Sequence, residues 1–318
     1  MNERAGFAGL TSSAVFGVIV GAFVVYGAVS WSDADGDAEP VARSATAEYG
    51  RQLLRETGAL IGPDHPDPEM RYSGTSMACA SCHLEIGTKP GTLTLLTAAE
   101  KYPRFSGRDG GERDLRDRIN GCMQRSMNGR PLPRDSVEMI AMEAYVNSLG
   151  DAWDAMGESR RAPDEQPAFV EPDRAARPEA GRAVFERRCS VCHGADGAGL
   201  RAADIEGGYV FPPLWGPDSF NNGAGMARVL TAAMFIKARM PLGQADLTDD
   251  EAYDVAAYVN SNPRPGMAGL DADYPDRATK PIDSPYPPYA DPFPQEQHKY
   301  GPFAPIREYY KTLKDQNR

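Results

Sequence analysis

Cys79-Ala80-Ser81-Cys82-His83 is the stretch that decides the fold of this chain, and it occurs a second time as Cys189-Ser190-Val191-Cys192-His193. Two cysteines three positions apart, with a histidine directly after the second, form the attachment signature of a c-type haem. Each thiol adds to a vinyl group of the porphyrin, and the histidine is the proximal ligand of the iron. A zinc knuckle or a redox-active C-x-x-C pair is the alternative, but each motif supplies three ligands where a structural zinc site needs four. We therefore expect two covalently bound haem c groups. The cofactor-binding residues are then Cys79, Cys82, His83, Cys189, Cys192 and His193.

The length, charge and cysteine content of the chain narrow its class. Its 318 residues leave room for two domains of ordinary size and extra segments. A formal net charge of −11 argues against nucleic acid as a partner, because binding to phosphates requires a basic face. Four of the five cysteines lie in the two motifs, so Cys122 has no partner for an internal disulfide. Haem attachment goes with an oxidising compartment, which points beyond the cytoplasmic membrane.

The N-terminal segment carries no charged residue from Ala5 to Ser32. This uncharged stretch exceeds the roughly 20 residues that span a bilayer. Arg4 precedes it and acidic residues follow it, an asymmetry that keeps the N-terminus inside and exports the rest. Ala28-Val29-Ser30 also offers a small-residue cleavage site for a signal peptide. We expect an uncleaved membrane anchor and a location on the periplasmic side of the cytoplasmic membrane, or in the periplasm if the segment is cleaved.

The chain contains an internal repeat. Ala144-Tyr145-Val146-Asn147-Ser148 recurs at residues 257–261, an offset of 113 positions, and the two haem motifs are 110 positions apart. Such self-similarity indicates two tandem copies of one fold. We expect an all-α protein made of two tandem cytochrome c domains, with a hydrophobic N-terminal segment and an irregular C-terminal extension that wraps over the surface. The expected division is 1–32 anchor or signal segment, 33–44 linker, 45–150 first cytochrome c domain, 151–177 linker, 178–265 second cytochrome c domain, and 266–318 Pro/Tyr-rich extension.

Apolar residues at helical spacing predict three helices in each domain. Gly129 and Gly150 are expected to end the second and third helices. Asp135 is expected to cap the third helix, and Thr248 with Glu251 forms a capping box for the last helix of the chain's second domain. Residues 87–112 are expected to form a loop. The predicted helices cover 48–60, 115–128 and 135–149 in the first domain, and 180–188, 224–238 and a segment after Thr248 in the second.

The sixth ligand of each iron decides what such a protein does. For the second haem, Met240 lies in a loop just before the last helix, where a thioether gives an ordinary electron-transfer centre. For the first haem, Met127 occupies the equivalent place and is one candidate ligand. Cys122 is the other, because Arg118, Cys122 and Ser126 are spaced four apart and share one helix face. A neighbouring cation favours the thiolate form of a cysteine. His65 and His298 are expected to be solvated. Lys237 could compete with Met240 for the iron when deprotonated, but it is also expected to be solvated. Arg125 and Arg130 are weaker candidates for binding an anion and are expected to be solvated like most surface arginines.

The residues around Cys122 resemble a known family. The run from Arg118 to Pro133, RINGCMQRSMNGRPLP, is similar to the signature of the dihaem thiosulfate dehydrogenases. Segments 211–216, 219–226 and 235–243 resemble the same family, so that the resemblance covers about residues 45–265. It implies a catalytic first haem with histidine and cysteine ligands and a second haem with histidine and methionine ligands. The implied iron ligands are His83, Cys122, His193 and Met240.

This resemblance implies that the protein oxidises two thiosulfate ions to tetrathionate, or runs the reverse reaction as a tetrathionate reductase. Electrons would pass from the first haem through the second to an external acceptor, such as a soluble cytochrome. The site must bring anions together, which requires fixed positive charge in a partly dry pocket. Arg108 and Arg118 match the positions that the family uses for this, Ser126 can donate a hydrogen bond, and Cys122 is a nucleophile as well as a ligand.

Two other functions remain open from the sequence. One is a membrane-anchored dihaem cytochrome that only transfers electrons, with Met127 bound to the first iron. The other is a sulfur-oxidation cytochrome subunit, which also has a cysteine-ligated haem but conjugates thiosulfate to a carrier protein. The run from Arg118 to Pro133 argues against the first of these, and formation of tetrathionate by the purified protein alone would argue against the second.

Overall fold

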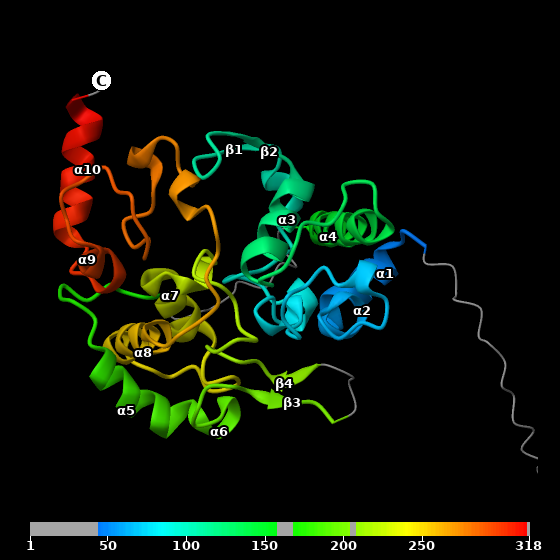
Figure 1. Cartoon of the computed structure of the whole chain (residues 1–318), viewed down its shortest axis with the longest axis horizontal. Helices are drawn as coiled ribbons and strands as arrows, with labels where there is room; N and C mark the ends of the chain where they lie inside the picture. Colours follow the sequence, from blue (N-terminus) through cyan, green and yellow to red (C-terminus); the bar gives the residue numbers. More distant parts are fainter. Residues whose placement is uncertain (1–43, 158–167, 204–207, 317–318) are drawn as a thin grey trace, which may run out of the picture. The chain divides into compact units, whose positions relative to one another are not determined.

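The computed structural model describes residues 44–157, 168–203 and 208–316 (Figure 1). The expected membrane anchor, Ala5–Trp31, lies outside these residues. Among the described helices, none has the length and apolar character needed to cross a membrane. Helices dominate the described chain, and its strands form two short antiparallel pairs. The predicted all-α fold class is confirmed.

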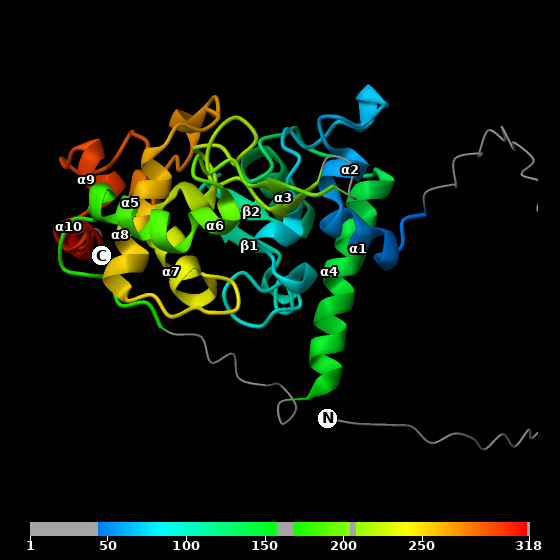
Figure 2. The same cartoon turned by 90° about the horizontal axis from the view of Figure 1, so that it is seen from below.

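The first domain has four α-helices and a β-hairpin in its described residues. Its first and last α-helices lie against each other (Figure 2), and Gly50 lies at their contact. A Cβ atom at this position would lie 2.0 Å from the carbonyl oxygen of Ala141, so only glycine allows the helices to approach this closely. Leu53 and Met139 are fully buried beside the crossing. The elements are α1 (Ala47–Arg55), α2 (Thr57–Ile61), α3 (Leu115–Arg125), α4 (Val137–Met156), and strands β1 (Arg104–Ser106) and β2 (Gly111–Arg113).

The second domain repeats the contact between its opening and closing helices. Gly181 lies at the contact between the opening and closing helices, where a Cβ atom would be 1.9 Å from the carbonyl oxygen of Asp254. The glycine at the helix crossing therefore occurs in both halves, as a tandem repeat requires. The predicted capping box of Thr248 and Glu251 is confirmed. The elements are α5 (Pro178–Arg188), α6 (Ser190–His193), β3 (Leu200–Arg201), β4 (Tyr209–Phe211), α7 (Val229–Arg239) and α8 (Asp249–Ser261).

The C-terminal extension packs against the second domain. Its first part contains only short turns, and its last part forms α9 (Gln295–Tyr300) and α10 (Ala304–Gln316). Phe303 and Ile306 are buried in one apolar cluster with Val229 of α7. The two terminal helices were not predicted, because the prolines that precede them masked the amphipathic pattern of the last residues.

His298 is fully buried in this extension, so the expectation of a solvated histidine is wrong. Its Nδ1 lies 2.7 Å from the carbonyl oxygen of Ile282, and its Nε2 lies 2.9 Å from a carboxylate oxygen of Asp291. The ring also stacks on Tyr289 at a centroid distance of 3.6 Å. His298 is therefore a structural residue of the extension, because both ring nitrogens are held by acceptors of its own segment.

The predicted limits of α4 are wrong at both ends. Ser136 caps the helix, and its hydroxyl accepts a hydrogen bond from the third helical residue at 3.2 Å, in place of the expected Asp135. At the other end the helix continues past Gly150 to Met156. Trp153 packs against the apolar core of the first domain, and this contact offsets the roughly 1 kcal/mol that a glycine costs inside a helix.

Other helix limits also differ from the prediction. α3 stops four residues before Gly129, and Asn128 takes the left-handed conformation (φ 47°) that asparagine tolerates. The predicted opening helix of the first domain is broken in two at Glu56. α7 begins at Val229 after a short 3-10 turn. The predicted loop at 87–112 contains the hairpin β1–β2.

Candidate active site

Both proximal histidines are oriented in the same way. His83 Nδ1 lies 2.7 Å from the carbonyl oxygen of Leu93, and His193 Nδ1 lies 2.8 Å from that of Pro212. Because a carbonyl oxygen only accepts, Nδ1 carries the proton and Nε2 is the nitrogen available to a metal. Burial lowers the pKa of His193, which favours the neutral ring that binds a metal. This donor set, with two cysteines beside each ring, fits haem c in both motifs.

Cys122 lies on α3 in contact with the first motif. Arg118, one helical turn earlier, donates a hydrogen bond from a guanidinium nitrogen to Cys122 Sγ at 2.9 Å. Burial raises the pKa of the Cys122 thiol, but the charge of Arg118 and a hydrogen bond with His83 outweigh it and lower the pKa to about 7. The structure thus brings three of the predicted site residues together and favours a thiolate near neutral pH.

Met127, the other candidate for the first iron, is packed in the apolar core of the first domain and is 3% exposed. Its neighbours in this cluster include Met123 and Leu132. Ser126 lies one turn after Cys122 as the C-terminal cap of α3 and is half-buried. The side chain that interacts with His83 is that of Cys122, so the geometry favours Cys122 over Met127.

Arg108 comes from the turn of the β1–β2 hairpin and is held by other parts of the chain. Its guanidinium donates to the carbonyl oxygen of Gly223 at 3.1 Å, and it lies 3.9 Å from a carboxylate oxygen of Asp273. It also lies 5.4 Å from the ring centroid of Tyr274. Arg108 therefore contacts the second domain and the C-terminal extension, whereas Arg118 contacts Cys122.

Arg125, a weaker candidate for binding the anion, is buried, so the expectation of a solvated side chain is wrong. It is 9% exposed. Its guanidinium forms an ion pair with Asp273 at 2.7 Å and donates to the carbonyl oxygen of Gly223 at 3.3 Å. No local pattern indicates this role, because Asp273 is 148 positions away in the sequence.

Met240, the expected sixth ligand of the second iron, is the half-buried C-terminal cap residue of α7. Lys237 lies one turn earlier. Its ammonium donates to the carbonyl oxygen of Leu247 at 2.7 Å and lies 3.7 Å from a carboxylate oxygen of Asp249. Lys237 is thus engaged by its own domain, and it would have to break these contacts to compete with Met240 for the iron.

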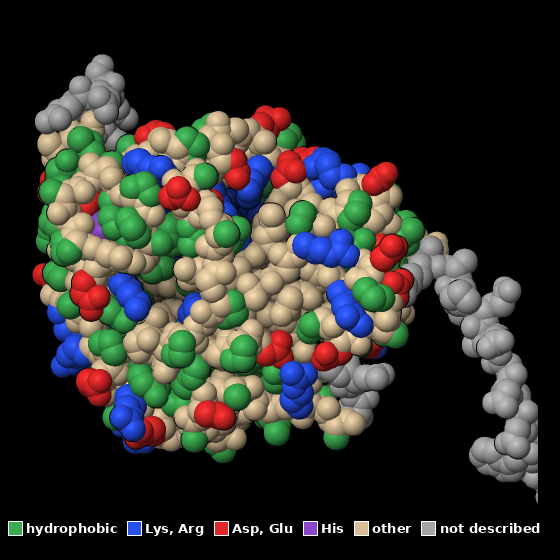
Figure 3. Space-filling model, viewed as in Figure 1, with side chains coloured by type: hydrophobic (Ala, Val, Ile, Leu, Met, Phe, Trp, Pro, Cys, Tyr) green, Lys and Arg blue, Asp and Glu red, His purple; other side chains and the backbone are tan. Residues whose placement is uncertain are grey.

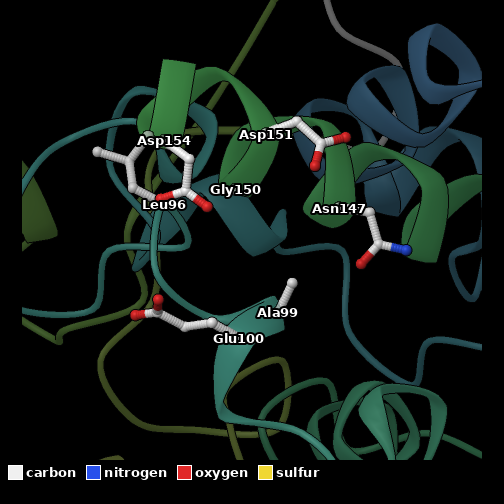
Figure 4. Close-up of a pocket in the computed structure, with 7 residues that line it drawn as sticks. All are labelled: Leu96, Ala99, Glu100, Asn147, Gly150, Asp151 and Asp154. Atoms are coloured by element: carbon white, nitrogen blue, oxygen red, sulfur yellow. The ribbon is translucent and has the colours of Figure 1, made fainter. Parts of the chain in front are cut away.

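A hollow of about 230 Å³ lies beside α4 (Figure 4). The carboxylates of Glu100, Asp151 and Asp154 surround it, together with apolar atoms of Leu96 and Ala99. An anion would be repelled there, so this hollow is not a candidate site for thiosulfate. Elsewhere the charges are mixed, and the face in Figure 3 shows basic and acidic side chains interspersed.

Comparisons with known proteins find relatives of both domains. Residues 71–152 match the SoxA/TsdA cytochrome c domain, and residues 176–259 match the family described as cytochrome C oxidase, cbb3-type, subunit III. Thiosulfate dehydrogenase of Allochromatium vinosum is 40% identical over 227 residues, which are 68% of this chain and 77% of the relative. That of Stutzerimonas stutzeri is 42% identical over 225 residues, covering 68% and 69% of the two chains.

A solved structure is also similar. Thiosulfate dehydrogenase (TsdBA) from Marichromatium purpuratum, in its as-isolated form, superposes with a TM-score of 0.59 and 34% identity. The superposition covers 69% of this chain and 46% of that one, so this chain spans about half the length of the solved relative. Two matched cytochrome c domains, each with its own attachment motif, confirm the expected pair of covalently bound haem c groups.

Proposed function

Since this chain belongs to the thiosulfate dehydrogenase family of dihaem c-type cytochromes, we propose that it oxidises two thiosulfate ions to tetrathionate at the first haem. The observation that carries the proposal is the contact of Cys122 with both Arg118 and His83. A cysteine held beside a proximal histidine is a second candidate ligand for the same iron, and its thiolate is a strong nucleophile.

Cys122 is proposed to act as the nucleophile in two steps. Its thiolate forms a disulfide bond with the outer sulfur of one thiosulfate, and two electrons are lost. A second thiosulfate then attacks that outer sulfur, which releases tetrathionate and restores the Cys122 thiolate. The two haems, when bound, supply acceptors for the two electrons. The reaction balances, because two thiosulfate ions give one tetrathionate ion and two electrons.

The arginines lower the electrostatic cost of these steps. Thiosulfate carries two negative charges, so the approach of a second dianion to a bound one is unfavourable without fixed cations. Arg118 stabilises the Cys122 thiolate and the incoming anion, and Arg108 is proposed to bind the sulfonate end of a substrate. Ser126, on the same face of α3, is proposed to donate a hydrogen bond.

Electrons are proposed to leave through the second haem. His193 and Met240 would ligate that iron, whereas His83 and Cys122 would ligate the first. Axial ligands change haem potentials over about 0.8 V, and a thiolate lowers the potential where a thioether raises it. Electron flow from the first haem to the second, and then to a soluble cytochrome or another external acceptor, is therefore downhill.

Replacement of Cys122 tests the proposal against simple electron transfer. Cys122→Ala should retain both haems, because all four attachment cysteines remain. Its first haem should lose the thiolate signature in electron paramagnetic resonance, and thiosulfate should reduce neither iron. Met127→Leu is the matched control and should keep both properties. If the Cys122 variant oxidises thiosulfate at the wild-type rate with an unchanged spectrum, the protein is an electron-transfer cytochrome with Met127 as ligand.

The conjugating sulfur-oxidation cytochrome, which the sequence left open, is a second candidate function, because the matched domain family is described as SoxA/TsdA and so names a second kind of protein. Purified protein incubated with thiosulfate and an artificial electron acceptor distinguishes them. We expect tetrathionate as the product in the absence of any carrier protein. A strict requirement for a carrier protein would identify the conjugating function.

The location of the protein is also a proposal. The uncharged N-terminal stretch of the sequence favours retention at the periplasmic side of the cytoplasmic membrane. Sequencing of the N-terminus of the mature protein tests this. A mature chain that starts at Trp31 would mean that the segment is a cleaved signal peptide and that the protein is free in the periplasm.

A further inference from the structure

Asp273, in the C-terminal extension, is a buried carboxylate between two arginines of the first domain. It is 8% exposed. One carboxylate oxygen accepts a hydrogen bond from Arg125 at 2.7 Å. The other accepts from the Tyr286 hydroxyl at 2.7 Å and lies 3.9 Å from Arg108. One acidic side chain of the extension therefore touches both cations and is itself fixed by a tyrosine.

The carbonyl oxygen of Gly223 holds the same two arginines from the second domain. It accepts from Arg108 at 3.1 Å and from Arg125 at 3.3 Å. Arg125 is on α3, three residues after Cys122, and Asn221 donates its backbone N–H to the Arg125 carbonyl at 3.1 Å. The pair of guanidinium groups is thus fixed between two acceptors that both come from outside the first domain.

The extension is also anchored beside Arg108 through its backbone. Tyr274 donates its N–H to the carbonyl oxygen of Arg108 at 2.7 Å. Tyr274 has a φ of 59°, which is rare for a bulky residue and persists only where surrounding contacts impose it. Lys280 contacts the same part of the extension. Its buried ammonium lies 4.3 Å from the Tyr286 ring centroid and donates a hydrogen bond to the Pro288 carbonyl at 3.0 Å.

We propose that Asp273 is a positioning residue for the thiosulfate site, which acts by holding the guanidinium groups of Arg108 and Arg125 in place. This inference rests on the proposed function, in which Arg108 binds the anionic substrate. It makes the C-terminal extension a determinant of substrate affinity. Asp273 does not touch the substrate and takes no part in the bond changes.

Removal of the Asp273 charge changes the affinity for a dianion in opposite directions under the two explanations, positioning and simple electrostatics. If Asp273 acted only as a nearby negative charge, its removal would strengthen the binding of a dianion. If it holds the arginines in place, its removal must weaken that binding although the site becomes more positive. If the contacts of Asp273 only stabilise the fold, its replacement would lower the melting temperature and leave the affinity of the folded enzyme for the dianion unchanged.

The test compares Asp273→Asn with Asp271→Asn in the holoenzyme. Both changes remove one negative charge within the same segment, and Asp271 is exposed. The readouts are KM and kcat for thiosulfate, and the inhibition constant of sulfate, a dianion that is not oxidised. For Asp273→Asn we expect KM and the sulfate constant to rise about tenfold, as for the loss of one charge-assisted hydrogen bond, with kcat changed less than twofold. For Asp271→Asn we expect no rise in either constant.

Equal or tighter binding of both anions by folded Asp273→Asn would overturn the inference. Tyr286→Phe provides a milder test if that variant does not fold, because it removes only the hydroxyl that holds Asp273. It should raise both constants by a smaller factor, and unchanged constants would count against positioning. If the wild-type enzyme itself does not oxidise thiosulfate, the proposed function fails first, so the two failures are distinguishable.

Discussion

Replacement of Arg118 by glutamine removes the cation beside the Cys122 sulfur and leaves a side chain of similar reach. The two groups are 2.9 Å apart. At this separation the Coulomb attraction is about 1.4 kcal/mol in a water-like dielectric constant of about 80, and several kcal/mol at about 20. Because the Arg118 side chain is exposed, solvent screens the pair, and the smaller figure applies to what the variant loses.

The lost attraction between Arg118 and Cys122 sets the expected change in kcat/KM. A loss of about 1.4 kcal/mol corresponds to about tenfold in an equilibrium or rate constant. We therefore expect Arg118→Gln to lower kcat/KM for thiosulfate by about tenfold. Arg118→Lys should lie between this variant and the wild type, since it keeps the charge and loses the planar fork of donors.

The assay is steady-state reduction of an artificial electron acceptor by thiosulfate, together with the spectrum of the first haem. Arg116→Gln is the matched control, because Arg116 lies on the same helix and pairs with Glu143 at 2.7 Å. It should keep the wild-type kinetics. If Arg118→Gln stays within twofold of the wild type in kcat/KM, the cation does not serve the reaction and the proposed role of Arg118 is wrong.

Three further predictions concern stability. Asn221→Ala leaves the carbonyl oxygen of Gln124 without its 2.8 Å donor and should cost about 1–3 kcal/mol of unfolding free energy; an unchanged melting temperature would contradict this. Gly50→Ala, with a Cβ 2.0 Å from the Ala141 carbonyl oxygen, should force α1 away from α4 and cost about 1–3 kcal/mol or more, whereas Gly111→Ala, with nothing within 4 Å, serves as the tolerated control. For Asp114, a hydrogen bond with Arg134 is the main cause that lowers the carboxyl pKa to about 2. The unfolded value is about 3.9, so the stabilisation is present above pH 4 and is lost as the pH falls towards 2. Asp114→Asn should therefore flatten the acid side of a plot of melting temperature against pH, and an equally steep plot would exclude this contribution.

Contacts within a few residues of the chain could be predicted from the sequence. The C-x-x-C-H motifs are contiguous, so covalent attachment follows from spacing alone. The pairing of Thr248 with Glu251 and the shared face of Arg118 and Cys122 follow from the helical period. The fold class follows because two such motifs, each followed by the same helical pattern, require two similar domains.

Helix ends were less predictable, because tertiary contacts compete with local signals there. Gly150 is a reasonable end signal by propensity, yet α4 continues because Trp153 reaches the core one turn further on. The same competition explains the N-terminal cap of α4, because Ser136 and its neighbour Asp135 are both residue types that favour the N-cap position. Only the path of the preceding loop decides between them.

The sequence by itself determined that this protein carries two haem groups, and which helix face bears the reactive sulfur. The tertiary structure alone decided which charges surround that site. Asp273 reaches Arg125 across 148 positions, and the Gly223 carbonyl reaches Arg108 across 115. No local period links such pairs. They meet only because the second domain and the extension pack against the first domain, as where Phe220 and Ala224, on either side of Gly223, are buried in the apolar cluster of the first domain. The free energy of that burial depends on the whole fold.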